Sequence, residues 1–288
     1  MATDAECPAL RNDVTMARFL IVPQWQGSPS PRAMQLSDGA QAIAGDLPRN
    51  ACTTVDVPLE AGEALETGVH RYSSLLRTSE VLGAALADET PPVIVIGGDC
   101  GVSVAPIGVA ARREERLAVV WFDAHPDLHT TSSSHSGAFG GMALSAVLGD
   151  GPKDLALEAG LVTPDRVVLA GARDYDPEEE PRAEAIGIAI LDAPELATGA
   201  ALTAALQAIQ PTGVYIHVDL DVLDPATLAG VMAPVPFGLS VAELVAAIAT
   251  ARAVAPLVGA TIAGFAPSSP TAAGDDLGAI LRVVGALA

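Results

Sequence analysis

Two largely apolar runs, Leu117–Phe122 and 214–218, constrain the fold of this chain more than any other feature. Both are typical of strands that are buried on both faces of a parallel sheet. Similar runs recur at 19–22, 51–57, 93–96, 166–170, 188–191 and 257–263, with Ala-rich stretches between them. A long helix is expected from about Glu60 to Ala87. The alternation predicts a single α/β domain over residues 1–288, a three-layer α/β/α sandwich around a mostly parallel sheet of about eight strands.

Each of the two central runs is closed by an acidic cluster. Asp123, His125 and Asp127 follow the first run, and Asp219 and Asp221 close the second. Residues at alternate positions of an extended segment point to one side, and parallel sheets bind ligands beyond the carboxyl ends of their strands. Four carboxylates gathered there repel one another unless cations lie among them. The number of oxygen ligands favours a pair of divalent ions over a single one.

Three further polar loops follow predicted strands or lie between them. They contain Cys100 in Gly97–Ser103, Ser136 in the Ser/Thr-rich segment 130–137, and Asp174 with Asp176 in 171–177. Each loop also has a simpler interpretation: a small buried thiol, solvated hydroxyls, and an aspartate that caps a helix. His217 lies inside its strand, where a histidine is ordinarily a core residue whose hydrogen bonds are satisfied.

Composition narrows the class of protein. The chain carries 35 acidic and 15 basic side chains, a net charge of −20, which argues against nucleic acid as a partner. No apolar run reaches the ~18 residues of a membrane-spanning helix. The acidic start, Met1–Glu6, lacks the basic region of a signal peptide, and three scattered cysteines do not suggest a disulfide framework. We therefore expect a cytoplasmic protein.

Five sequence blocks together resemble the arginase–agmatinase (ureohydrolase) family: G-G-D-C, D-A-H-P-D, S-G-A-F-G-G, R-D-Y-D-P and D-L-D-V-L-D-P. The resemblance implies an eight-stranded parallel sheet, a binuclear manganese site, and hydrolysis of a guanidino or related C–N bond in a small substrate. It also implies a homo-oligomer, a trimer or a hexamer. The resemblance also implies roles for single residues. Asp123 and Asp219 would be bridging carboxylates, His125 and Asp221 would be ligands of one ion, and Cys100 and Asp127 would be ligands of the other. Ser136, Asp174 and Asp176 would contact the amino-acid end of the substrate.

In the implied mechanism, a hydroxide that bridges the two ions attacks the guanidino carbon, and Asp127 orients it and accepts its proton. Three positions depart from the family pattern. Cys100 stands where most members have a histidine, Gly140 stands at a proton-shuttling histidine, and Gly264 stands at a glutamate that contacts the guanidinium. His129 or His135 could supply the missing proton, and we assign this catalytic role to His129.

These departures argue against ordinary L-arginine as the substrate and favour a compound such as N-hydroxy-L-arginine. Because a thiolate is softer than an imidazole, Cys100 also allows one ion only, or a metal other than Mn²⁺. The alternative is a catalytically degenerate homologue that binds metal or an amino acid. A two-metal phosphatase or nuclease is disfavoured because basic residues are lacking near these loops, and a deacetylase because no adjacent histidine pair is present.

Overall fold

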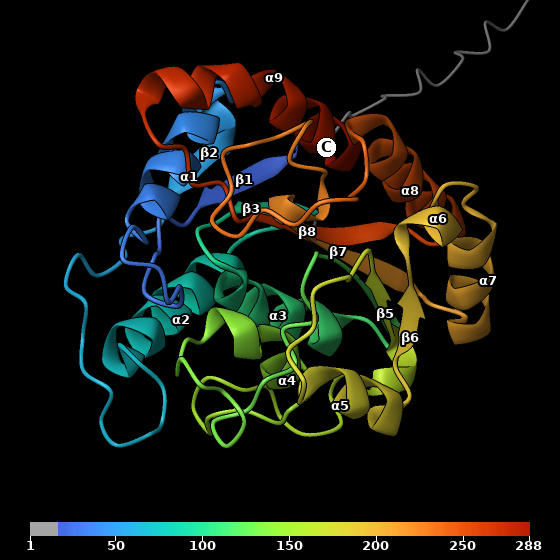
Figure 1. The fold of residues 1–288 in the computed structure, drawn as a ribbon, viewed down its shortest axis with the longest axis horizontal. Coiled ribbons are helices and arrows are strands. Elements are labelled where there is room, and N and C mark those ends of the chain that lie inside the picture. The colour runs from blue at the N-terminus through green and yellow to red at the C-terminus, as the bar shows by residue number, and fades with distance from the viewer. Residues whose placement is uncertain (1–16, 91) are drawn as a thin grey trace, which may run out of the picture.

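A computed structural model describes residues 17–90 and 92–288 of the chain (Figure 1). Its eight strands form one sheet in the order β2-β1-β3-β8-β7-β4-β5-β6, and every neighbouring pair is parallel. The strands are β1 (Arg18–Ile21), β2 (Cys52–Thr54), β3 (Val93–Ile96), β4 (Leu117–Phe122), β5 (Val167–Ala170), β6 (Ala189–Leu191), β7 (Gly213–Asp219) and β8 (Leu257–Ala263). The predicted α/β class and eight-stranded sheet are confirmed.

Helices cover both faces of the sheet. The α-helices are α1 (Gln35–Gly45), α2 (Tyr72–Ala87), α3 (Val104–Arg113), α4 (Ala143–Val147), α5 (Glu179–Ile186), α6 (Ala193–Leu196), α7 (Ala200–Ile209), α8 (Val241–Val254) and α9 (Pro270–Leu287). Short 3-10 helices are η1 (Arg49–Ala51), η2 (Cys100–Ser103), η3 (Gly140–Met142), η4 (Pro164–Arg166) and η5 (Leu220–Val222). In Figure 1, α1, α7, α8 and α9 lie on one side of the sheet, and α2, α3 and α4 lie on the other. The three-layer sandwich is therefore also confirmed.

The helix expected from Glu60 to Ala87 is wrong in its first part, since α2 begins only at Tyr72. Residues 60–71 form turns instead. The backbone is left-handed at Gly62 and Gly68, with φ of +82° and +79°, and again at Arg71, with φ of +58°. A right-handed helix cannot pass through such residues, so the segment stays irregular until the last of them.

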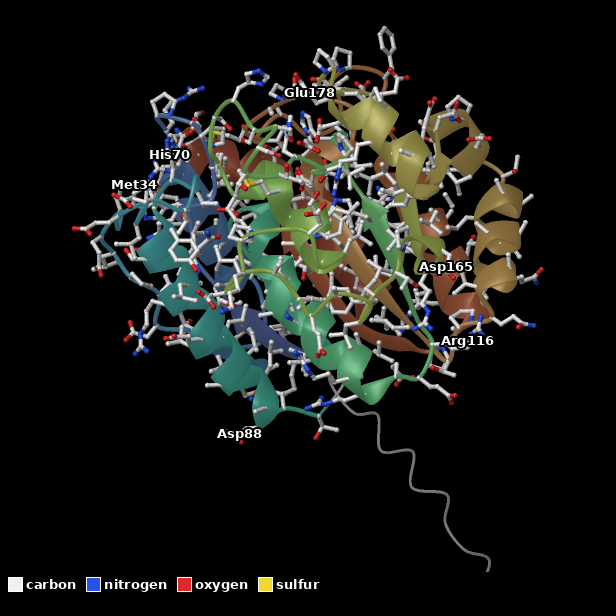
Figure 2. The ribbon with its side chains drawn as sticks, turned by 90° about the horizontal axis from the view of Figure 1, so that it is seen from below. Met34, His70, Asp88, Arg116, Asp165 and Glu178 are labelled. Atoms are coloured by element: carbon white, nitrogen blue, oxygen red, sulfur yellow. The ribbon has the colours of Figure 1, made fainter. Side chains whose placement is uncertain are left out.

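The sheet order explains why distant loops meet. The strands that precede the polar loops are consecutive neighbours in the sheet, β3-β8-β7-β4-β5. Their ends are level, because Phe122 pairs with Val218, and Val218 and Ile96 both pair with Ile262. Figure 2 shows His70 and Glu178 at one end of the molecule, opposite Arg116 and Asp165, which lie just before β4 and β5. The loops after these five strands therefore emerge side by side at one edge.

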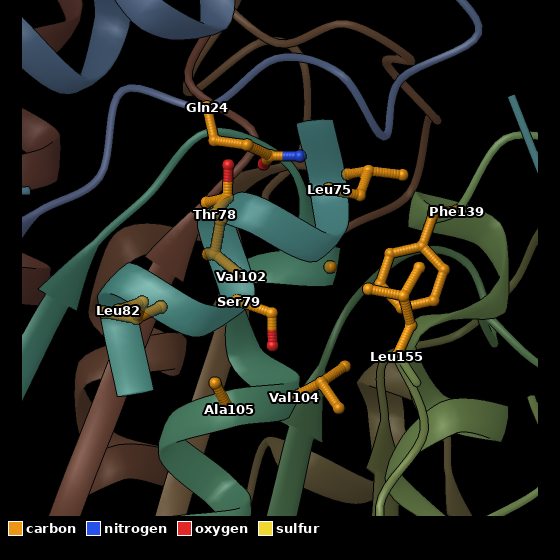
Figure 3. A pocket seen from close by; sticks show the side chains of 11 residues that line it. Gln24, Leu75, Thr78, Ser79, Leu82, Val102, Val104, Ala105, Phe139 and Leu155 are labelled. Carbon is orange, nitrogen blue, oxygen red and sulfur yellow. The ribbon is translucent and has the colours of Figure 1, made fainter. Parts of the chain in front are cut away.

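A small cavity of about 20 Å³ lies between α2 and α3, beside the turn η2 (Figure 3). Its lining is mostly apolar, with Leu75, Leu82, Val102 and Phe139, and it includes no ionisable side chain. The volume suits about one water molecule. This cavity is a packing defect rather than a site for chemistry.

In the described part of the chain, no helix combines the length and the apolar character needed to cross a membrane. The acidic Met1–Glu6 segment and Cys7 lie outside the described residues. The single domain over residues 1–288 stays a prediction.

The helix layers depend on buried leucines, and this can be tested on α8. Leu244 is completely buried, whereas Leu59 is 89% exposed. We expect Leu244→Ala to lower the free energy of unfolding by about 2–5 kcal/mol, because it leaves a cavity in the core. The matched control, Leu59→Ala, should change it by less than about 0.5 kcal/mol. If urea denaturation shows the same loss of unfolding free energy for both variants, the packing of α8 against the core is contradicted.

Candidate metal centre

The loop after β4 carries Asp123 and Asp127 into the centre of the edge. Asp123 is buried and accepts hydrogen bonds from the backbone N–H of His125 at 2.7 Å and from Trp121 Nε1 at 3.2 Å. Asp127 has a φ of +52°, a left-handed conformation that is costly for a residue other than glycine. Such strain gathers at functional sites, where the surrounding structure holds it in place.

The loop after β7 is joined directly to the first cluster. The Asp219 carboxylate accepts from the N–H of Asp221 at 3.0 Å, and Asp221 accepts from the N–H of Ala124 at 3.1 Å. His125 Nδ1 lies 3.0 Å from Asp221 Oδ2 and 3.5 Å from Asp123 Oδ1. The two acidic clusters predicted from sequence therefore form one group.

Cys100 completes this group from η2, the turn that follows β3. Its Sγ lies 2.9 Å from Asp219 Oδ2 and 3.8 Å from Asp123 Oδ2. Burial and the carboxylates of Asp127, Asp219 and Asp123 raise the pKa of this thiol well above its usual value. A thiol in such surroundings becomes a thiolate only when a cation is bound beside it.

Two adjoining cavities receive the predicted site residues. One, of about 290 Å³, is lined by Cys100, Asp219 and Asp221, and the other, of about 350 Å³, by Ser136 and Asp174. The side chains of His125 and Asp127 line both cavities. The second cavity also includes His129, Asp176 and Glu179. The structure thus brings the predicted metal ligands together and places the predicted substrate contacts next to them.

His129 lies inside the second cavity, whereas His135, on the same segment, is exposed. His129 Nε2 is 2.9 Å from Asp176 Oδ2, and Nδ1 is 3.1 Å from Ser133 Oγ. Glu179, which sequence reasoning missed, accepts from the N–H of Leu128 at 2.9 Å and of Asp176 at 3.2 Å. Its only signal in the sequence is the three-residue spacing from Asp176, which is typical of a helix start.

The electrostatics of the group call for added positive charge. Burial and then the neighbouring carboxylates raise the pKa of Asp127, Asp219 and Asp221 above the ordinary 3.8. Burial alone would lower the pKa of His125, but Asp123 and Asp221 raise it to about 12. Burial likewise opposes the ionised form of Asp123, yet the imidazoles of His125 and His217 hold its pKa below the usual range.

The residues fit divalent ions. Among the described residues, the buried Asp127 Oδ2 has no hydrogen-bond partner, which is rare for a carboxylate oxygen. Within the residues that the structure describes, three sets of side chains each offer ligand atoms within 4.8 Å of one another. Two lie in the acidic group, namely Asp123, His125 and Asp221, and Cys100, Asp123 and His217, and the third is His129, Asp176 and Glu179 in the second cavity. Carboxylate, imidazole and thiolate are common ligands of first-row divalent metals.

A side chain would fit only tightly at Gly140 and is opposed by the backbone at Gly264. A Cβ on Gly140 would lie 3.2 Å from the carbonyl oxygen of Gly27, which already accepts the Gly140 N–H at 2.9 Å. Gly264 has a φ of +85°, and a Cβ there would lie 2.1 Å from Asp219 Oδ1. The departure at Gly264 is therefore built into the backbone, whereas the one at Gly140 would require only a small shift of its neighbour.

The raised pKa values give a prediction for the metal-free protein. Its folded state holds protons on Asp127, Asp219 and Asp221 that the unfolded chain releases above about pH 4. These groups therefore stabilise the fold less as the pH rises. His125, whose pKa of about 12 lies above its ordinary value, likewise makes the fold less stable as the pH rises above about 6.5.

After chelation, we expect the melting temperature to fall between about pH 5 and pH 8. Asp219→Asn should flatten this slope because it removes one of the responsible carboxyls, whereas Asp38→Asn, on the exposed surface of α1, should leave it unchanged. Added divalent metal should reverse the slope, because its ligands must lose their protons. A melting temperature that rises with pH in the chelated protein would refute this electrostatic account.

Comparison with curated proteins identifies relatives at the sequence level. The chain is 34% identical over 203 residues to an arginase of Bacillus caldovelox, a match that covers 65% of this chain and 68% of the relative. It is 28% identical over 198 residues to an arginase of Staphylococcus aureus, covering 65% of each. The matches thus span about two thirds of these relatives.

Solved structures extend the likeness to nearly the whole fold. An Entamoeba histolytica arginase in complex with L-ornithine superposes with a TM-score of 0.82 at 22% identity, covering 94% of this chain and 97% of that one. A proclavaminate amidinohydrolase of Streptomyces clavuligerus gives a TM-score of 0.70 at 20% identity, covering 94% and 92%. The sequence model of the arginase family matches residues 27–284. The chain therefore belongs to the arginase family, whose members are binuclear-metal hydrolases of C–N bonds in linear amidines.

Proposed function

We propose that this chain hydrolyses a guanidino C–N bond in an N-hydroxyguanidino substrate such as N-hydroxy-L-arginine, rather than in L-arginine. The observation that carries this proposal is the backbone at Gly264, where φ is +85° and Asp219 Oδ1 occupies the space of a side chain. No carboxylate can extend from that position toward a cationic guanidinium. A substrate whose guanidino group is neutral does not need one.

Two divalent ions are proposed between the acidic clusters. Asp123 and Asp219 would bridge them, His125 and Asp221 would complete one, and Cys100 and Asp127 the other. When bound, the ions supply the acidity that turns water into a nucleophile near neutral pH. Mn²⁺ is the family expectation, but the buried thiol of Cys100 favours a softer metal such as Zn²⁺ or Fe²⁺.

The hydroxyl of an N-hydroxyguanidine withdraws electrons, so the group is less basic than a guanidinium and its neutral form is available near pH 7. Hydrolysis adds the oxygen of water to the guanidino carbon and breaks the bond to the alkyl nitrogen. The leaving nitrogen takes a proton, and the products are hydroxyurea and L-ornithine. This chemistry matches a site without the carboxylate and imidazole that the family places at Gly264 and Gly140.

The chain's own residues are proposed to carry out proton transfer and substrate binding. Asp127 is proposed to orient the attacking water and accept its proton, and its Oδ2, buried and unpartnered among the described residues, supports this role. His129 is proposed to donate the proton to the leaving nitrogen, with Asp176 at 2.9 Å holding its ring. Ser136, Asp174 and Asp176 in the 350 Å³ cavity would bind the amino-acid end.

A homo-oligomer, either a trimer or a hexamer, stays a prediction from the family resemblance, and a cytoplasmic location stays a prediction from the sequence composition.

A substrate panel tests the proposed reaction. L-arginine, N-hydroxy-L-arginine, agmatine, guanidinobutyrate and formiminoglutamate would each be assayed for amine release with Mn²⁺, Zn²⁺, Fe²⁺ and Ni²⁺. We expect kcat/KM for N-hydroxy-L-arginine to exceed that for L-arginine by about 100-fold or more, a difference of about 3 kcal/mol in transition-state stabilisation. Comparable rates would identify an ordinary arginase. Metal binding without turnover of any compound would favour the degenerate homologue.

The roles of His129 and Asp176 can be separated kinetically. We expect His129→Asn to lower kcat by about 100-fold or more with little change in KM, since general acids contribute about 10²–10⁴-fold. Asp176→Asn should raise KM, because it weakens substrate binding, and should lower kcat by a smaller factor than His129→Asn does, because it only releases the His129 ring. His135→Asn, an exposed position on the same segment, is the matched control and should retain full activity. If His129→Asn keeps the parental kcat, His129 is not the acid.

A further inference from the structure

His217 is a buried residue with one nitrogen that its packing does not explain. Its ring is fully buried in β7 and stacks on the ring of Trp121, with centroids 3.7 Å apart and an interplanar angle of 20°. Nδ1 lies 2.7 Å from the hydroxyl of Ser103. Among the described residues, Nε2 has no hydrogen-bond partner. A histidine kept for packing alone would have both nitrogens satisfied.

The unpartnered nitrogen is directed at the acidic group. Nε2 is 3.9 Å from Asp123 Oδ2, which in turn lies 3.8 Å from Cys100 Sγ. The ligand atoms of these three side chains all fall within 4.8 Å of one another. Two ligands of one ion, at about 2.0–2.3 Å from it, are separated by at most about 4.3 Å. Both measured separations to Asp123 are below this limit.

The contact with Ser103 is compatible with the neutral tautomer of His217 that carries its proton on Nδ1. When Nδ1–H donates to Ser103 Oγ, the lone pair of the neutral imidazole is on Nε2 and points at the group. A ligating histidine usually has such a partner on its other nitrogen, which fixes the tautomer and the ring orientation. Ser103 and Cys100 are the two ends of the same short helix, η2, so one turn of chain presents both the thiol and the hydroxyl.

We propose that His217 Nε2 is a ligand of the metal ion that Cys100 and Asp123 bind, a role that neither the family pattern nor our sequence analysis assigns to it. The imidazole that is missing at Cys100 is thereby supplied from β7. The inference rests on the metal-dependent site proposed above, and it adds that this ion has a sulfur, nitrogen and oxygen donor set. Such a set favours Zn²⁺, Fe²⁺ or Co²⁺ over Mn²⁺.

Co²⁺ binding to the full chain tests this without relying on turnover. Thiolate-to-Co²⁺ absorption would report the ion at Cys100, and a competing chelator would give its affinity. The variant His217→Phe keeps an aromatic ring on Trp121 but removes the nitrogen. We expect it to weaken Co²⁺ binding at this ion by about 100-fold and to shift the visible absorption bands. His125→Ala is the matched control, since it should perturb the other ion and leave the thiolate band in place.

Unchanged affinity and an unchanged spectrum in His217→Phe would overturn the proposal. Should that variant fail to fold, the parent chain with Co²⁺ provides the answer, because each ligating imidazole gives a hyperfine-shifted, exchangeable ring N–H signal. We expect one signal to remain in His125→Ala and to change in Ser103→Ala. Its absence would also overturn the proposal. Turnover by the parent chain together with an unchanged spectrum in His217→Phe would refute the ligand role alone. A shifted spectrum in that variant, with no turnover by the parent chain, would refute only the proposed reaction.

Discussion

Repulsion among four buried carboxylates is the constraint on which the rest of this structure depends. Asp123 and Asp219 are fixed beside each other because they follow Phe122 and Val218, which pair in the centre of the sheet. Asp127 and Asp221 lie in the same group, and burial raises the pKa of both. A parallel sheet with helices on both faces cannot move two central strands apart to relieve such repulsion. The charge must be neutralised where it stands, by protons or by bound cations.

The arginine at this edge does not neutralise the carboxylates by direct ion pairs. Arg173 lies at the same edge, yet its guanidinium donates to the carbonyl oxygens of Gly171, Asp221 and Val235 rather than to a carboxylate. It fixes the loop after η5 and leaves the acidic group open to the cavity. The protonated form of His125 offsets part of the charge in the metal-free chain. A divalent ion replaces that proton with a larger charge, so metal binding and stability are coupled.

Sequence reasoning predicted the parts of the site that follow from strand periodicity. The runs before Asp123 and Asp219 are buried strands, and the level ends of neighbouring strands bring the two clusters together. It failed where side-chain position depends on distant contacts. It also failed before Tyr72, where left-handed residues delay the start of α2 beyond the start that the sequence predicted. Glu179 accepts one N–H from Asp176, which their spacing indicates, and one from Leu128, 51 positions earlier, which no local pattern reveals.

For His217, the sequence predicts burial but not the hydrogen-bonding state of its ring. Its burial follows from its place in an apolar strand, and that part of the interpretation is confirmed. The state of its second nitrogen depends on Ser103, 114 positions earlier in the chain, and on the turn that also carries Cys100. A strand pattern indicates which face a residue occupies. It does not indicate whether a polar atom on that face finds a partner.

The departures from the family pattern are physically linked through Asp219. One carboxylate oxygen of Asp219 lies 2.9 Å from the sulfur of Cys100, and the other occupies the space that a side chain at Gly264 would need. A glutamate at Gly264 would have to adopt a left-handed backbone and displace Asp219, and moving Asp219 would remove the neighbour of the thiol. A glutamate at Gly264 would therefore disturb a predicted metal ligand instead of recovering a substrate contact. The predicted metal ligands and the predicted substrate contacts of this chain are therefore not independent, since both depend on the position of Asp219.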